Sequence, residues 1–251
     1  MSRQNIIQLL GSQTTVTSGG SLALTSVSPN LQIFTGTSAH TVTLPSANSV
    51  LSLEANRSFR VRNLSTGLVT VRDGGANILL SMQANSNAIF TLVDPTSFGT
   101  WDIEYKHTGS ATTTISASTT APTKGSTSQD FIAWNVINKQ MFINCNFSQI
   151  SAGTNGSGTY RIAIPSGYSA LSTRYTFNAS PISAAVSVIG TGQVFTSGAQ
   201  YLAHITLASA TLMSLKVILS TTGIATAWGS GTAGLANTPL TVAFSAALTI
   251  A

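Results

Sequence analysis

Apolar and polar residues alternate along most of the chain, and this period-two pattern limits the possible folds more than any other feature of the sequence. The alternation runs through residues 59–62, 69–72 and 101–105, and it returns at 141–147 and 240–244. Because successive side chains of a strand point to opposite faces, such segments are typical of half-buried β-strands. Turns rich in glycine, asparagine and serine separate them. The pattern predicts an all-β fold.

The composition agrees with a packed β-protein that has a neutral polar surface. Charged residues make up 7 % of the chain and apolar residues 43 %, whereas ordinary soluble proteins carry about 25 % charged residues. Apolar residues spread through the whole chain argue for a core rather than for disorder. At 251 residues the chain is long enough to bury that core without disulfides or metal ions.

The sequence divides into four expected segments. Residues 1–20 form a short N-terminal arm, and residues 21–107 form a small β-barrel or β-sandwich. Residues 108–128 lose nearly all aromatic and large apolar side chains and indicate a Ser/Thr-rich linker. Residues 129–251 hold about eight short strands, which favours a jelly-roll-like β-sandwich. No period of about 20 to 50 residues is visible, so neither a propeller nor a solenoid is indicated.

The arm contains the one persuasive helix candidate, from Gln4 to Leu10, closed by Gly11. A helix this short is unstable alone, so its apolar face needs a partner surface, and we expect it to anchor the protein. That face consists of Ile6, Ile7, Leu9 and Leu10. The apolar run is too short for a signal peptide or a transmembrane segment, so we expect no membrane insertion.

The charge pattern argues against a nucleic-acid partner. Eleven cationic residues face six acidic ones, giving a net charge of +5, but no run of lysine or arginine occurs. Binding to a phosphate backbone needs clustered cations with stacking aromatic side chains. Arg60, Arg62 and Arg72 fall on outward positions of two adjacent strands, where we expect them to be solvated or to face acids such as Asp102 and Glu104.

Elimination leaves no catalytic, cofactor or metal site. No Asp or Glu follows Asp130, so the second half lacks the carboxylates that acid–base catalysis and hard metal ions need. His40, His107 and His204 lie too far apart for a local metal motif. Cys145 stands alone, which excludes a disulfide, and its strand position predicts core packing. We therefore expect a protein that is not an enzyme.

One nucleotide-binding motif is matched by its letters alone. Residues 229–234 read GSGTAG and fit the pattern GxGxxG. A dinucleotide site needs that loop to open a helix, with an acid about twenty residues later. Here a strand pattern follows and no acid does, so the segment is interpreted as a turn between strands.

Four recurrent features of the first half resemble a β-module of tailed-bacteriophage fibres and other virion proteins. They are TVTLP at 41–45, N-x-S-T-G at 63–67, a V-T-V strand with paired glycines at 69–75, and a closing G-T-W at 99–101. In that setting we expect Gly67, Gly74 and Gly75 to supply positive φ at hairpin ends. We expect Trp101 to fill the centre of the domain.

The second half is similar to β-sandwich tip domains of the same proteins. The similar stretches are 121–125, Trp134, 156–160 and 164–168. Together the two resemblances imply a non-enzymatic structural protein of a tailed-phage virion. Such a protein would be made in the bacterial host cytoplasm, displayed on the virion surface, and assembled as a homotrimer.

The resemblance leaves the position on the virion open. A capsid decoration protein (a cement or head-fibre protein) would dock on the major capsid protein through its N-terminal arm. The alternative is a tail fibre, or tail-associated receptor-binding protein, that contacts other tail proteins and recognises host surface glycan; a cellular lectin or adhesin is a third class. For glycan recognition the candidate contact is Trp228, an isolated aromatic residue among uncharged loops, although the same residue also suits the core.

Overall fold

A computed structural model of the chain describes residues 11–46, 56–175, 177, 187–196, 198–218, 225–229, 234–236 and 238–251. The expected helix from Gln4 to Leu10, and with it the anchoring residues Ile6, Ile7, Leu9 and Leu10, lies outside the described residues. Every helix or strand element within them is a strand, so the all-β prediction is confirmed. Within this part of the chain, no helical segment has the length and hydropathy that crossing a membrane requires.

The chain separates into two compact units. Unit 1 comprises residues 1–108 and 136–138, and unit 2 comprises residues 109–135 and 139–251. Except for Thr108, the expected linker lies inside unit 2.

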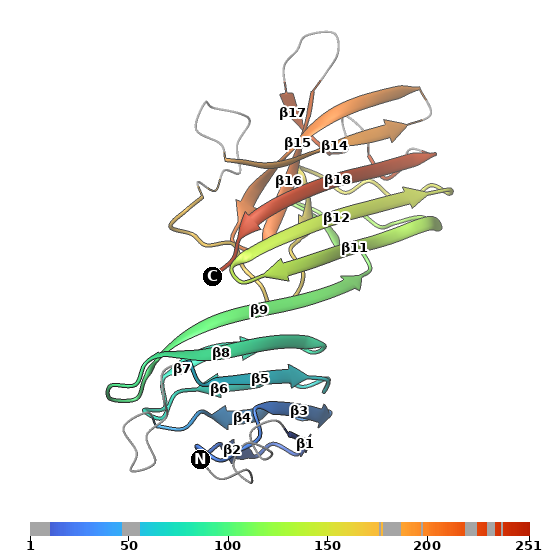
Figure 1. The fold of residues 1–251 in the computed structure, drawn as a ribbon. Helices are drawn as coiled ribbons and strands as arrows, with labels where there is room; N and C mark the ends of the chain where they lie inside the picture. The colour runs from blue at the N-terminus through green and yellow to red at the C-terminus, as the bar shows by residue number, and fades with distance from the viewer. Residues whose placement is uncertain are drawn as a thin grey trace. The chain divides into compact units, whose positions relative to one another are not determined.

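Unit 1 consists of two β-sheets between which the chain alternates (Figure 1). One sheet has the order β1 (Ser12–Thr17), β3 (Leu31–Gly36), β5 (Ser58–Asn63), β8 (Ser86–Asp94) and β9 (Thr100–Ala111). The other has the order β2 (Ser21–Ala23), β4 (His40–Thr43), β6 (Val69–Arg72) and β7 (Ile78–Met82). Because β1 is a paired member of the first sheet, residues 12–17 belong to unit 1 and not to a free arm.

The first six strands form three turns of a parallel two-sheet coil. The β1–β3, β3–β5, β2–β4 and β4–β6 ladders are all parallel. Ser12 pairs with Leu31, a turn of 19 residues, whereas Leu31 pairs with Arg60, a turn of 29. The prediction that no solenoid repeat exists is therefore wrong. The connection between Thr43 and Ser58 lengthens one turn by about ten residues and hides the period.

Apolar side chains fill the space between the two sheets. The buried positions alternate along the strands as the sequence pattern predicts, and they include Phe34, Val42, Phe59, Val61, Val69 and Val71. Phe59 pairs across the β5–β8 ladder with Phe90, which is also fully buried. Trp101 is 8 % exposed, with its ring centroid 6.2 Å from that of Phe59, so it fills the centre of unit 1 as expected.

Glycines of the recurrent motifs serve close packing, and the prediction that they adopt positive φ is wrong. Gly67, Gly74 and Gly75 are not among the positive-φ residues. A Cβ on Gly67 would lie 2.1 Å from the carbonyl oxygen of Ser38, and one on Gly75 would lie 2.6 Å from the ring of Phe98. Gly74 is similarly confined by backbone. These positions need glycine because neighbouring segments leave no room for a side chain.

The N-x-S-T-G motif closes its turn through one buried side chain. The side-chain nitrogen (Nδ2) of Asn63 donates to the carbonyl oxygens of Gly67 (2.9 Å), Met82 (3.1 Å) and Gln83 (3.0 Å). Its side-chain oxygen accepts hydrogen bonds from the backbone nitrogen and hydroxyl of Ser65, at 3.0 and 2.6 Å. Asn63 is 0 % exposed. It therefore fastens its own turn to the β7–β8 connection.

The three arginines do not share a sheet. Arg60 and Arg62 lie on β5, whereas Arg72 lies on β6 in the opposite sheet. Arg60 is exposed and donates from Nε to the side-chain oxygen of Asn87 at 2.8 Å. Arg62 and Arg72 are half-buried. Adjacency along the chain therefore does not make one basic patch.

His40 is a titratable residue of the unit 1 interior. Its side chain is 7 % exposed, and its ring centroid lies 5.4 Å from that of Phe34. Neither ring nitrogen has a hydrogen-bond partner among the described residues. Burial lowers the pKa of His40 from the ordinary 6.5, and burial likewise lowers the pKa of His107, opposed by the hydrogen bond that His107 makes to the backbone of Ala84.

We expect the free energy of unfolding to fall as the pH drops below 6.5. The unfolded chain then binds protons that the folded histidines still exclude, so stability is lost at up to about 1.4 kcal/mol per pH unit for each histidine. His40→Phe keeps an aromatic ring at this position and should flatten the slope below pH 6.5. Urea unfolding at several pH values measures it. If the free energy of unfolding of the variant depends on pH as steeply as that of the wild type, His40 is not a source of the pH dependence.

Unit 2 is a single run of hydrogen-bonded strands around its own core (Figure 1). The order is β11 (Thr127–Ile137, of which 127–135 belong to the unit), β12 (Gln140–Gln149), β18 (Leu240–Thr249), β14 (Val188–Thr196), β15 (Ala199–Ser209), β16 (Leu212–Ile218), β13 (Tyr160–Ala163) and β10 (Ile115–Ala117). The short β17 (Ala225–Ala227) pairs with β16. Cys145 is buried with Met141, Ile143 and Phe147, as the alternation predicts.

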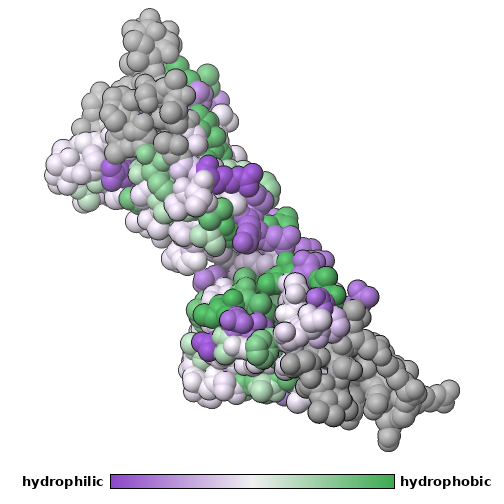
Figure 2. Space-filling view, turned by 90° about the vertical axis from the view of Figure 1, so that its left-hand side faces the viewer, coloured by the Kyte–Doolittle hydropathy of each residue, from purple (hydrophilic) through white to green (hydrophobic). Residues whose placement is uncertain are grey.

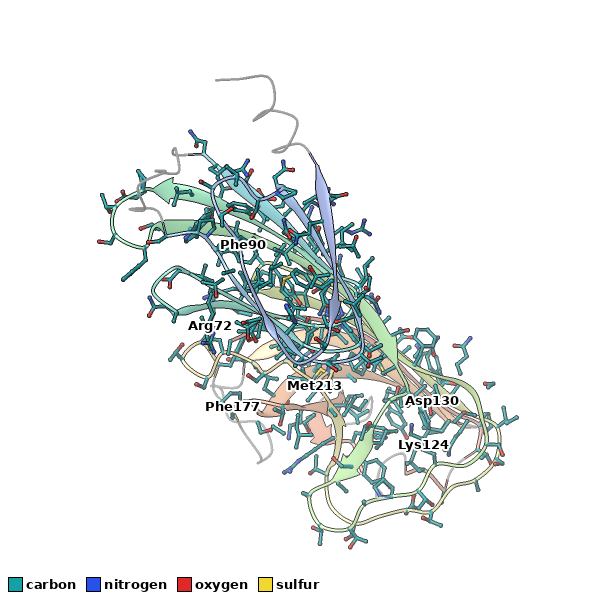
Figure 3. All side chains as sticks on the ribbon, turned by 90° about the horizontal axis from the view of Figure 1, so that it is seen from below. Arg72, Phe90, Lys124, Asp130, Phe177 and Met213 are labelled. Atoms are coloured by element: carbon teal, nitrogen blue, oxygen red, sulfur yellow. The ribbon has the colours of Figure 1, made fainter. Side chains whose placement is uncertain are left out.

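The Ser/Thr-rich stretch contributes an ion pair to unit 2. Nζ of Lys124 lies 2.8 Å from a carboxylate oxygen of Asp130, and the two side chains lie together in Figure 3. The other carboxylate oxygen of Asp130 accepts the backbone N–H of Thr113 at 3.0 Å. Lys124 also lies 5.5 Å from the ring centroid of Phe147. This pair ties residues 113–130 into the sandwich.

The surface of both units mixes apolar and polar residues. On the face shown in Figure 2, hydrophobic residues lie among near-neutral and hydrophilic ones. Large apolar side chains that are exposed include Val16 and Ile78 in unit 1 and Phe142 and Ile150 in unit 2. Single exposed apolar residues are normal on a protein surface, so a ligand site must be identified from concave shape and from oriented polar groups as well.

Candidate ligand-binding face

Trp228 is a core residue and not an exposed platform. Its side chain is 0 % exposed, and its ring lies edge-on to that of Tyr160 at a centroid distance of 5.0 Å. Its backbone nitrogen donates to the carbonyl oxygen of Leu215 at 3.0 Å. A sugar needs an accessible ring face for stacking. The expected glycan contact at Trp228 is therefore corrected to a packing role.

An exposed polar row crosses three neighbouring strands of unit 2 instead. Asn144 on β12 pairs with Ser245 on β18, and Ser245 pairs with Thr191 on β14. Directly opposed residues of antiparallel strands lie on the same face of a sheet. All three side chains are exposed. We call Asn144, Ser245 and Thr191 the polar row; the strands that carry it lie side by side in Figure 1.

The polar row has hydrogen-bonding capacity left for a ligand. The hydroxyl of Ser245 donates to the side-chain oxygen of Asn144 at 2.7 Å, which orients the amide and leaves its nitrogen available. Among the described residues, no hydrogen-bond partner is found for the side chains of Thr191, Asn146 and Gln193. Asn146 and Gln193 flank Ala243 in the next row along the strands.

Two open grooves lie on either side of the polar row and share its three residues. The first groove has a volume of about 520 Å³, and the second has a volume of about 530 Å³. Outside the polar row, the first is lined by Phe131, Asn146, Gln193, Leu202 and Ala243, among others. The second is lined by Phe142, Val188 and Ala247, among others. Each groove thus has an exposed phenylalanine at one side and an exposed aliphatic residue at the other.

Glycines beneath the face allow β14 to lie against β18. A Cβ on Gly192 would lie 2.4 Å from Cβ of Phe244, and one on Gly190 would lie 2.1 Å from the carbonyl oxygen of Ser245. A side chain at either position would push the two strands apart. The register that aligns Thr191 with Ser245 therefore depends on these glycines.

The grooves are electrically neutral. None of the described lining residues is charged, and the segments of unit 2 outside the described residues contain no charged residue. Along the same row, Thr191 pairs with His204, and His204 pairs with Lys216. Lys216 is 1 % exposed, and burial lowers its pKa. Its charge is therefore not displayed in either groove.

Two further titratable groups of the described residues are held by their own surroundings. Burial raises the pKa of the Cys145 thiol to about 11, so it is protonated at neutral pH. Both carboxylate oxygens of Asp73 accept hydrogen bonds within their own turn, from Gly75 and Asn77. Within the described residues, no cluster of three or more His, Cys, Asp or Glu side chains could hold a metal ion.

Comparison with known proteins gives little. No family model matches the chain, and no curated protein matches it. Among solved structures, the chain is similar to the crystal structure of the Dettilon tailspike protein, with 11 % sequence identity and a TM-score of 0.39. The match covers 95 % of this chain and 45 % of that one, so the chain spans less than half of the tailspike's length. A likeness this loose carries no functional inference.

Proposed function

We propose that the chain is a non-enzymatic surface protein of a tailed-phage virion, and that unit 2 attaches it to glycan on the host surface. One observation carries the attachment role: two open grooves share a row of exposed, uncharged polar side chains on the outer face of unit 2. Ligand sites are typically concave, with a few oriented polar groups among apolar walls. This supports the tail-fibre reading over a purely architectural one.

The virion setting rests on the sequence resemblance, whose motif residues are scaffold residues in unit 1. Asn63 fastens a turn, Gly67 permits close packing, and Trp101 fills the interior. A rigid coil that carries a separate binding unit suits a fibre. For unit 2 the non-enzymatic proposal is supported by its acidic side chains, of which Asp130 is the single one in the sequence of that unit and is paired with Lys124.

Competition for adsorption tests the attachment role. Purified full-length protein is mixed with host cells before virions of the phage that encodes it are added. At a protein concentration about ten times its Kd, the adsorption rate constant should fall roughly tenfold, because most receptors are occupied. Heat-denatured protein serves as the control. Adsorption that is unchanged at saturating protein would overturn the proposal.

Capsid decoration is the second candidate, favoured by the apolar sequence of Ile6, Ile7, Leu9 and Leu10. The copy number per virion separates the two candidates: hundreds of chains support decoration, and a handful of trimers supports a tail position.

The anchor is tested by deleting residues 1–10 only, because a deletion through residue 20 would also remove β1. The homotrimer is part of this proposal, and light scattering should give three times the 25.9 kDa chain mass.

A further inference from the structure

We infer that the two grooves of unit 2 bind one neutral oligosaccharide that crosses the polar row. This rests on the proposed attachment function and specifies its ligand. The inference follows from the groups on the face, from their spacing and from the absence of charge.

The groups on the face match both sides of a sugar ring. Pyranose rings present an apolar face of C–H groups and a rim of hydroxyls, so they pair with aromatic rings and with uncharged donors and acceptors. Phe131 and Phe142 are 41 % and 46 % exposed, which leaves ring surface available for C–H groups. Asn144 and Thr191 are exposed and line both grooves, and the hydrogen bond from Ser245 occupies only the side-chain oxygen of Asn144.

The spacing favours an oligosaccharide over a single sugar. Ala247 in the second groove and Ala243 in the first lie four residues apart on β18, with Ser245 between them. At about 3.3 Å per residue this is roughly 13 Å, longer than one pyranose ring. Because the alanines keep the floor low on both sides of Ser245, a chain of sugars can pass over the row.

The absence of charge selects against acidic glycans. A carboxylate or phosphate that loses water must gain a cation or several donors in return. The grooves offer no lysine or arginine among their described lining residues. Neutral hydroxyl and acetamido groups can be satisfied by amide and hydroxyl partners at no such cost.

Glycan-array binding of the full-length protein tests the inference, with neutral linear oligosaccharides and sialylated or uronate-containing ones as the two arms. We expect binding in the neutral arm only. Phe142→Ala should weaken it about fivefold or more, and Thr191→Val should weaken it about two- to tenfold. The matched controls are Ile150→Ala and Thr112→Val, exposed positions of unit 2 away from the grooves, which should leave binding unchanged.

Each other outcome has a distinct meaning. Binding confined to the acidic arm, or unchanged in both groove variants, would overturn the inference while leaving glycan attachment intact. If the protein binds neither arm, and saturating protein also leaves the adsorption of virions to host cells unchanged, the proposed function is overturned as well. If Phe142→Ala instead lowers the mass measured by light scattering, the face is an interface between copies of this chain, which also overturns the inference.

Discussion

Replacing Trp228 with alanine is expected to lower the free energy of unfolding by about 3–5 kcal/mol, the range for large aromatic residues in cores. The indole is 0 % exposed and packs edge-on against Tyr160, so its removal leaves a cavity that rigid strands cannot fill. Urea unfolding followed by circular dichroism measures the change.

The matched control for this prediction is Phe142→Ala, which removes an aromatic ring that is 46 % exposed. Stability should then change by about 0.5 kcal/mol or less, as for most surface substitutions. A Trp228→Ala protein as stable as this control would show that the indole does not support the core. The pair thus separates packing from ligand contact, with the ligand effect expected at Phe142 alone.

Asn63→Ala is expected to destabilise unit 1 by about 2–4 kcal/mol. The substitution removes the donor that the carbonyl oxygens of Gly67, Met82 and Gln83 share, and it removes the acceptor of the buried Ser65 backbone N–H. The Gly67 and Gln83 oxygens keep hydrogen bonds from serine hydroxyls. Each buried group that is left unsatisfied costs about 1–3 kcal/mol, partly recovered if water enters. The melting temperature of the full-length chain is the readout.

The Asn63→Asp variant tests the role of the side-chain nitrogen of Asn63 separately from that of its oxygen. Aspartate keeps the shape and the oxygen that accepts from Ser65, but it turns a carboxylate toward three carbonyl oxygens. We expect this variant to be at least as destabilised as the alanine variant. Wild-type stability in the Asn63→Asp protein would mean that the three carbonyl contacts do not matter. Asn87→Ala, on the outer face of β8, is the neutral reference.

Much of the local structure could be predicted from the sequence because the alternation of apolar and polar residues shows which side chains of a strand face the core and which face outward. The alternation identified the buried positions Phe59, Val61, Cys145 and Phe147. It did not identify the partner of each strand. Hydrogen bonding between β1, β3 and β5 depends on residues 19 and 29 apart, and one lengthened connection was enough to conceal the repeat.

The candidate face was missed for the same reason. Phe142, Asn144 and Asn146 occupy outward positions that are visible in the sequence of β12. Their partners on β18 lie about a hundred residues later, as Asn144 with Ser245 shows. Trp228 drew attention as a lone aromatic residue in a neutral loop, but burial is set by packing against Tyr160. The residue type alone could not show whether Trp228 is buried in the core or exposed to a ligand.

The position of the polar row on strands, with a side-chain period of two, has a consequence for how unit 2 can vary. Asn144 and Ser245 alternate with buried residues of β12 and β18, and Thr191 lies between the half-buried Gly190 and Gly192. Substitutions at these outward positions are therefore expected to leave the fold intact. If unit 2 binds glycan as proposed, the same scaffold can change its sugar preference by such substitutions, because its recognition chemistry is separate from its folding chemistry.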